Sequence, residues 1–572
     1  MFVASSYAFR NVYSQKTSAS GSLLEVDCLV LGGGITGAGV ARDAAMRGLR
    51  TLLVDSHDFA SGTSHLTSKL IHGGLRYLDQ GKIRLAAEGV MERDRLLNRL
   101  APNLVRPMKF IIPYEGRKLP KWLFTVVGIQ TYGFIELYRS GRGCLPLFAG
   151  QLRRNYPALL EHPFGVSYWD AQTNDARLVI AVLRTANAHG AATMNHTSMH
   201  DARFDGDAWR VSLLRDGQEL NVRARSVVNA TGPWSLNAAR QLGIESANLL
   251  WLKGSHLLVT RKPTFGNDAI IIRSVRDNRP LWVIPWETRL IVGSTEKRFD
   301  GDLREVHPDA DEVEDLWGSL LHFFPGCHFT REDIKGAYAG VRPIVAQDEE
   351  SENRLSRRHE IQLDRQRRLI TIHGGKLTTF RKMAEEAVDQ LGDLLGVAAP
   401  SSELRGKLRK ALLWPDIDRP QAKQLSDELA SHVSDTNVAR TVVDHLVRIY
   451  GSDSREILTT GRLQPDGLTP LFEGLPYTLA ELTYLIRTEH VLHLADLAKR
   501  RTSTYFLADR AGLDRWPTIL NALARDLSWS PRRQNEELAE LDRQFRADMA
   551  AMNEPFPSGP DHIRLHDVVT ET

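Results

Sequence analysis

The feature that most constrains this chain is a glycine-rich turn near its start. Gly32, Gly34 and Gly37 form the pattern G-x-G-x-x-G, which follows the apolar run DCLVL (27–31) and opens the helical segment AGVARDAAMRG (38–48). Glycines at these positions permit a tight turn and let main-chain amides approach a pyrophosphate at the start of the helix. The pattern therefore predicts a β-α-β unit that binds a dinucleotide.

A carboxylate completes this unit. RTLLVD (50–55) is predicted as the second strand, and it ends at Asp55, roughly 20 residues beyond the last glycine, where a carboxylate binds a ribose hydroxyl. Because NAD and FAD proteins share this unit, the glycine spacing alone leaves both cofactors open.

The rest of the chain predicts an α/β fold that is α+β overall. Strand-like runs recur as far as RLITIHGG (368–375), which a helix-like segment (378–395) follows. After the break AAPSS (398–402), Leu, Ala, Arg and Glu recur at helical spacing. We expect a Rossmann-like cofactor domain with an inserted mixed β-sheet substrate domain, and then an all-helical C-terminal domain. The predicted boundaries are 1–24 for an N-terminal tail, 25–398 for the cofactor and substrate domains, 403–550 for the helical domain and 551–572 for a flexible tail. Within 25–398, the cofactor-binding parts are 25–100, 165–240 and 340–398, and the substrate- or membrane-facing parts are 101–164 and 241–339.

Composition argues against several classes of protein. A formal net charge of +3 over 572 residues does not favour nucleic-acid binding. The three cysteines, Cys28, Cys144 and Cys327, lie far apart without metal-ligand spacing, so neither a metal site nor a disulfide framework is expected. No run reaches the roughly 20 apolar residues that span a bilayer.

One uncharged segment has two equally weighted interpretations. WLFTVVGIQTYGFI (122–135) carries no charge and is flanked by basic residues on both sides. It suits a segment that lies in a membrane interface, or a core helix.

Two further segments suit a cofactor that extends deep into the protein. SGTSHLTSKLIHGG (61–74) is rich in hydroxyls and glycine, and a later strand ends in NATGPW (229–234). Histidine and paired glycines are poor core residues, so the first segment is a candidate for the floor of an active site.

A series of motifs along the chain is similar to those of one known family. LGGGITGAGVARDAAMRGL, ASGTSHLTSKLIHGGLRYL, DARLVIA, NATGPW, KGSHLLV, VIPW, GVRPI and HGGKLTTFRKMAE occur in this order, and TEHVLHLADLAKRRTS follows in the C-terminal region. Through them the chain closely resembles the FAD-dependent (aerobic type) glycerol-3-phosphate dehydrogenases of the D-amino-acid-oxidase-like flavoprotein superfamily. The resemblance covers about residues 26–530.

The resemblance implies tightly bound, non-covalent FAD. Asp55 departs from the family, which more often has Glu there, although the shorter carboxylate still reaches a hydroxyl. The residues expected to bind FAD are Gly32, Gly33, Gly34, Ile35, Thr36, Gly37, Asp55, Ser61, Thr63, Ser64, Ser68, Leu70, Ile71, His72, Gly73, Ala230, Thr231, Gly232, Lys376, Leu377 and Thr378.

The resemblance also implies a cationic substrate pocket. A polyol phosphate carries about two negative charges at neutral pH, which Arg binds through two hydrogen bonds and Lys as a point charge. The positions that match the family's pocket are Arg76, Tyr77, Arg342, Arg357 and Lys376.

The implied reaction is oxidation of sn-glycerol 3-phosphate to dihydroxyacetone phosphate by hydride transfer from C2 to flavin N5. Arg342 and Lys376 would stabilise developing negative charge. His72, His256 and an arrangement centred on Arg342 are alternative proton acceptors, because a neutral imidazole is the natural base near pH 7. For His72, a hydrogen bond to the flavin or to adjacent main chain is as well supported as a role in proton transfer. His373 is expected to serve in packing.

The electron acceptor stays open between two alternatives. Dehydrogenases of this family usually pass electrons to membrane quinone, whereas related oxidases use oxygen; a flavin-binding interaction protein without turnover is a rival of another class. We expect a peripheral protein on the inner, cytoplasmic face of a bacterial membrane. The lack of a calcium-binding loop after the C-terminal domain favours this over the mitochondrial form, and a homodimer is left open.

Overall fold

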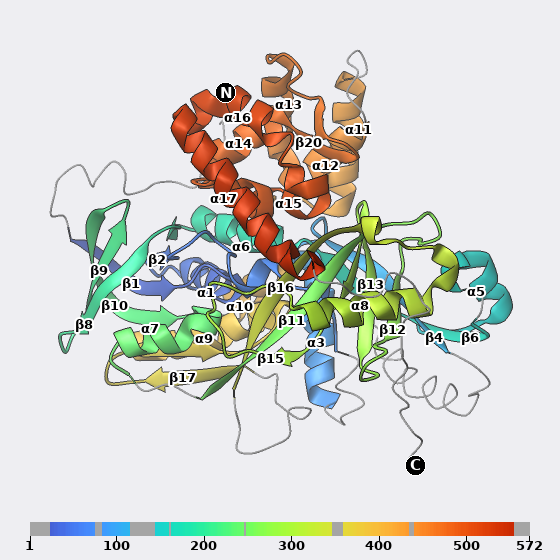
Figure 1. The fold of residues 1–572 in the computed structure, drawn as a ribbon. Helices are drawn as coiled ribbons and strands as arrows, with labels where there is room; N and C mark the ends of the chain where they lie inside the picture. Colours follow the sequence, from blue (N-terminus) through green and yellow to red (C-terminus); the bar gives the residue numbers. More distant parts are fainter. Residues whose placement is uncertain are drawn as a thin grey trace.

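Two β-sheets and a group of C-terminal helices make up the chain (Figure 1). The computed structural model describes residues 23–74, 83–114, 143–159, 162–244, 248–345, 359–433 and 440–553. It confirms the expected fold class of a Rossmann-like domain, a mixed-sheet domain and a helical C-terminal region.

The first sheet has the predicted β-α-β unit at its centre. Its parallel strands lie in the order β18-β10-β1-β2-β7, and antiparallel strands extend it on the β18 and β10 sides. These strands are β1 Leu24–Leu31, β2 Thr51–Val54, β7 Ala192–Met194, β8 Ser198–Phe204, β9 Trp209–Arg215, β10 Gln218–Asn229, β17 Glu360–Asp364 and β18 Leu369–His373. The central strands are apolar runs because both faces of the sheet are covered. The helices packed on this domain are α1 Ile35–Met46, α6 Asp175–Ala188, α7 Ser235–Gln241 and α9 Phe380–Leu395.

The second sheet is mixed and lies in the middle of the sequence. Its order is β15-β11-β14-β13-β12-β4-β6-β3, with β16 also paired to β11 and β5 to β6. Its strands are β3 Leu70–Ile71, β4 Val105–Tyr114, β5 Leu145–Phe148, β6 Phe164–Thr173, β11 Leu249–Thr260, β12 Ala269–Arg273, β13 Pro280–Trp286, β14 Arg289–Gly293, β15 Lys297–Arg298 and β16 Ile334–Val345. The accompanying helices are α3 Ile83–Arg95, α5 Ala149–Asn155 and α8 Ala310–Phe323.

The C-terminal helices gather on one side of both sheets, and α17 runs from them toward the second sheet (Figure 1). They are α11 Arg419–His432, α12 Arg440–Tyr450, α13 Ser454–Arg462, α14 Leu479–Thr488, α15 Thr504–Leu507, α16 Trp516–Leu527 and α17 Pro531–Met549, with the π-helical turn η10 Asp496–Arg501. Helix α10 Ser402–Lys410 lies apart from them beside α9, where Arg409 donates to Glu385 at 2.6 Å (Figure 1). A short hairpin of β19 Pro470–Phe472 and β20 Leu475–Thr478 lies between α13 and α14. Gly474 turns the chain in this hairpin at a φ of +68°. The 3-10 turn η12 Ala550–Asn553 continues past residue 551, where the tail was expected to begin.

No helix of the described ranges is both long enough and apolar enough to cross a bilayer. The uncharged segment 122–135 lies outside these ranges, so its two interpretations both stay predictions.

Candidate active site

The glycine turn between β1 and α1 forms one end of a deep cavity. Gly32 has a φ of +104°, and a Cβ there would lie 2.6 Å from the carbonyl oxygen of Ala230. A Cβ on Gly37 would collide with the carbonyl of Gly32. Helix α1 has no side-chain cap and no acidic residue in its first turn, which leaves its positive end suited to an anion.

Asp55 follows β2 beside this turn. Its Oδ2 accepts a hydrogen bond from the Gly33 amide at 2.6 Å and its Oδ1 accepts one from the His57 amide at 2.9 Å. Desolvation nevertheless raises the pKa of Asp55 to about 6, above its ordinary value of 3.8. The carboxylate is therefore held in place by main-chain donors and faces the cavity, as a ribose-binding group requires.

The cavity has a volume of about 350 Å³ and extends from Asp55 to the segment 374–377. Predicted residues that line it are Gly32, Gly34, Ile35, Thr36, Asp55, Ser61, Thr63, Ser64, Ala230, Thr231, Gly232, Lys376 and Leu377. Residues that sequence reasoning did not select include His57, Thr197, Ser198, Met199, Trp234, Asn237, Gln241 and Pro343. Trp234 is the last residue of the NATGPW motif, so the sequence offered a signal for it. Residues 197–199 follow the three-residue strand β7, where the sequence has no motif.

These surroundings fit FAD. The glycine cradle, the uncapped start of α1 and the Asp55 carboxylate suit an ADP group at one end of the cavity. Ser64 lines the cavity next to the cradle, and its Oγ accepts a hydrogen bond from the Ile35 amide at 3.0 Å.

At the far end, the HGG turn and the KLT segment are bound to each other. The amide of His72 donates to Thr378 Oγ1, and that hydroxyl donates back to the His72 carbonyl, both at 3.2 Å. Leu70 and Ile71 form β3 on the edge of the second sheet, and the amide of Gly73 donates to Asp170 at 3.0 Å. The side chain of His72 is exposed, whereas the rest of this turn is buried.

His256 lies at a junction of the second sheet. On β11 it pairs with Gly293 of β14 and with Tyr338 of β16, whose ring stacks on the imidazole at 4.7 Å. Its Nε2 is 2.8 Å from Ser68 Oγ, and its buried Nδ1 has no hydrogen-bond partner among the described residues. Burial, and then Arg342 and Lys69, hold the pKa of His256 well below its usual value, so the ring is neutral at pH 7.

Arg342 lies one strand away from His256. It pairs with Leu252 across β16 and β11, its Nη2 donates to Ser294 Oγ at 3.0 Å, and a Cβ on Gly254 would lie 3.2 Å from that nitrogen. The guanidinium is thus held close to the sheet within electrostatic range of His256. The structure does not describe Arg76, Tyr77 or Arg357, so their predicted pocket roles stay predictions.

The other histidine of an HGG motif is buried. Nδ1 of His373 is 3.1 Å from Ser235 Oγ and Nε2 is 3.4 Å from Gln362 Oε1. Burial lowers the pKa of His373.

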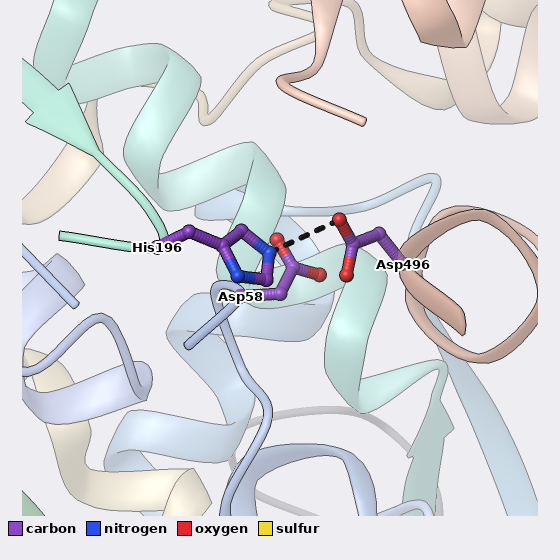
Figure 2. Close-up of side chains that lie close together, drawn as sticks. All are labelled: Asp58, His196 and Asp496. Atoms are coloured by element: carbon purple, nitrogen blue, oxygen red, sulfur yellow. Dashed lines mark hydrogen bonds and ion pairs between the residues drawn. The ribbon is translucent and has the colours of Figure 1, made fainter. Parts of the chain in front are cut away.

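Asp58, His196 and Asp496 bring three potential metal-ligand atoms within 4.8 Å of one another, and Figure 2 shows His196 joined to Asp496. Both carboxylates are already engaged, however, because Arg500 donates to Asp58 at 2.6 Å and to Asp496 at 2.8 Å. A metal ion would have to displace these cations, so the cluster is better described as an ion-pair network.

Two families match the chain. The family described as FAD dependent oxidoreductase matches residues 27–392, and the family described as C-terminal domain of alpha-glycerophosphate oxidase matches residues 418–534. The matches confirm the expected family and FAD as its cofactor.

Relatives that match most of this chain carry related names. Glycerol-3-phosphate dehydrogenase of Synechocystis sp. is 30% identical over 535 residues, which are 90% of this chain and 95% of that protein. D-erythritol 1-phosphate dehydrogenase of Brucella abortus is 31% identical over 512 residues, covering 87% and 99%. The mitochondrial glycerol-3-phosphate dehydrogenase of Rattus norvegicus is 32% identical over 545 residues, covering 91% and 73%.

A solved structure has the same overall fold. Glycerol-3-phosphate dehydrogenase from Bacillus halodurans, complexed with FAD, superposes with a TM-score of 0.75 at 25% identity, covering 96% of this chain and 100% of that one.

Proposed function

We propose that this chain, an enzyme of the FAD-dependent oxidoreductase family, oxidises sn-glycerol 3-phosphate to dihydroxyacetone phosphate. The observation that carries this proposal is the placement of Arg342 within electrostatic range of His256, which contacts Ser68. Thr67 and Pro343, the chain neighbours of Ser68 and Arg342, line the cavity that fits FAD. Bound FAD supplies a two-electron acceptor for the hydride that leaves C2.

The cations give the site its selectivity for a phosphate ester. Arg342 lies on β16 of the second sheet, and Lys376 lies in the loop after β18 of the first sheet. Both match positions in the substrate pocket of the resembled family. Fixed cations in a desolvated pocket bind a dianion and stabilise the negative charge that develops on the substrate oxygen.

The hydroxyl proton of the substrate needs an acceptor as the hydride leaves. Ser68 Oγ, which lies 2.8 Å from Nε2 of neutral His256, can relay this proton to the ring. His72 is the alternative, because its exposed ring lies on the turn that is bound to Thr378.

We further infer that the electrons pass to a membrane quinone and that the protein binds a bacterial membrane from its cytoplasmic face. The basic flanks of the uncharged segment 122–135 support this proposal. Oxygen as acceptor is the alternative.

Anaerobic reduction of the bound cofactor tests the substrate. We expect glycerol 3-phosphate to bleach the yellow holoenzyme without oxygen, and Arg342→Ala to slow bleaching by roughly 100-fold or more while FAD stays bound. Reoxidation by a soluble quinone should be much faster than by oxygen. Yellow protein that stays oxidised, or an Arg342→Ala variant with normal kcat and KM, would contradict the proposal.

The Brucella relative suggests a four-carbon competitor. D-Erythritol 1-phosphate should reduce the enzyme with a lower kcat/KM than glycerol 3-phosphate, because its extra carbon needs room that the three-carbon ester does not. A higher kcat/KM for the erythritol ester would assign the enzyme to that substrate instead.

A further inference from the structure

The motif TEHVLHLADLAKRRTS lies more than 400 residues from the glycine turn, yet it contacts both loops at the ribose end of the cofactor cavity. One loop, 55–59, follows β2, and the other, 195–199, follows β7 and includes the first two residues of β8. We name residues 489–501 of this motif the C-terminal clamp.

The clamp binds the first loop through Asp58. Arg501 donates from Nη1 to Oδ2 and from Nη2 to Oδ1, both at 2.8 Å, and Arg500 donates from Nε to Oδ2 at 2.6 Å. The side chains of Asp58 and Arg501 are both 0% exposed. A bidentate pair of this kind fixes the direction as well as the position of the carboxylate.

The clamp binds the second loop through two neighbouring side chains. Asn195 donates from Nδ2 to the His490 carbonyl and to Asp58 Oδ1, each at 2.8 Å. His196 Nε2 lies 3.2 Å from Asp496 Oδ2 (Figure 2).

The two loops are also joined to each other at the ribose carboxylate. The amide of Thr197 donates to the Asp55 carbonyl at 2.7 Å, and the amide of His196 donates to the His57 carbonyl at 2.8 Å. Phe59 packs against the glycine turn, since a Cβ on Gly33 would lie 2.6 Å from its ring, and this ring makes a T-shaped contact with His490.

Helix α6 anchors the clamp from behind. Buried Glu489 accepts two hydrogen bonds from Arg177, at 2.5 and 3.1 Å, and one from Arg184 at 3.1 Å. The clamp therefore rests on the cofactor domain and cannot shift without breaking buried ion pairs.

We propose that the C-terminal clamp pre-organises the ribose and adenine end of the FAD site, with Asp58, Arg500, Arg501 and His196 as positioning residues for cofactor binding. Loops that are already ordered lose less conformational entropy when a ligand binds, so the clamp raises affinity without touching FAD. This role concerns the cofactor and does not depend on which substrate is oxidised.

FAD titration of the apoprotein tests the clamp in the full-length chain. We expect Asp58→Asn to raise the Kd for FAD by about 100-fold and the milder His196→Gln to raise it by about fivefold. Asp509→Asn is the matched control, because it removes an inter-domain pair with Arg289, at 2.6 Å, that contacts neither loop. It should change the Kd by less than about twofold.

Hydrogen exchange of the apoprotein separates positioning from general stability. In His196→Gln, amides of 55–59 and 195–199 should exchange faster while those of α9 stay as in the unmodified protein. Unchanged Kd values in both Asp58→Asn and His196→Gln, unchanged exchange in the two loops, or an equal loss of affinity in Asp509→Asn would overturn the proposal.

Discussion

At the scale of single residues, Asp55 combines two opposing demands. Its carboxylate is desolvated, which raises its pKa to about 6, and yet both oxygens accept main-chain hydrogen bonds that favour the ionised form. Only the ionised group is a full acceptor for a ribose hydroxyl, so its titration and cofactor binding are linked.

FAD affinity should therefore depend on pH through this residue. As the pH falls below about 6, Asp55 takes up a proton in the apoprotein and the Kd for FAD should rise by up to about tenfold per pH unit. Asp55→Asn should bind FAD roughly 10- to 100-fold more weakly at pH 8, with a nearly flat profile. Fluorescence titrations between pH 5 and 8 measure both; parallel profiles for the two proteins would exclude Asp55 as the titrating group.

At the scale of elements, the β1–α1 connection allows little change. Gly32 combines a positive φ with close approach of the Ala230 carbonyl, whereas Gly48, just after α1, has a φ of +84° and open space within 4 Å of where a Cβ would lie. Comparing substitutions at the two glycines therefore distinguishes the cost of a positive φ from the steric cost of adding a side chain in the cofactor cradle.

Alanine at these two positions should have different effects. Gly48→Ala should lose about 1 kcal/mol of stability from backbone strain and keep its FAD. Gly32→Ala adds a clash with the strand end and should yield protein without bound flavin. The ratio of absorbance at 450 and about 280 nm in purified protein measures retention; equal flavin content in both variants would show that strain alone matters at Gly32.

At the scale of the whole molecule, α17 ties the C-terminal helices to the domain of the second sheet through His307. His307 Nδ1 is 2.7 Å from Asp548 and His493 Nδ1 is 2.9 Å from Glu537, and each hydrogen bond to a carboxylate raises the pKa of its histidine. Tyr505 also donates to Asp548, at 2.6 Å.

Docking of α17 should weaken in alkali. A histidine whose pKa is raised on folding contributes stability that is complete below its unfolded pKa of about 6.5 and is lost as the pH rises through the folded value. His307→Gln should lower the opening free energy of α17 by about 1 kcal/mol at pH 6 and by much less at pH 9.

Hydrogen exchange of α17, corrected for the intrinsic rate, measures this difference. His432→Gln is the control, because Nδ1 of His432 bonds a main-chain carbonyl within α11. If the His307 variant and the unmodified protein differ by the same opening free energy at both pH values, the stability does not come from the protonated His307–Asp548 pair.

Sequence alone was enough to predict the dinucleotide unit, the order of the motifs and the family. The tight turn of Gly32, Gly34 and Gly37 and the place of Asp55 beside it could be predicted, because they follow from backbone sterics over a few tens of residues. Much of the cavity lining was predictable too, since NATGPW and HGGKLTT follow strands of the same parallel sheet.

The contacts that those motifs make emerge only from the tertiary fold. Arg501 and Asp58 are 443 positions apart, and no spacing rule links residues that meet because two domains pack together. For the same reason, the contact of His256 with Ser68 and the lining by 197–199 could not be predicted. Local backbone sterics therefore determined that a dinucleotide is bound, whereas long-range packing decided which distant side chains meet around the cavity.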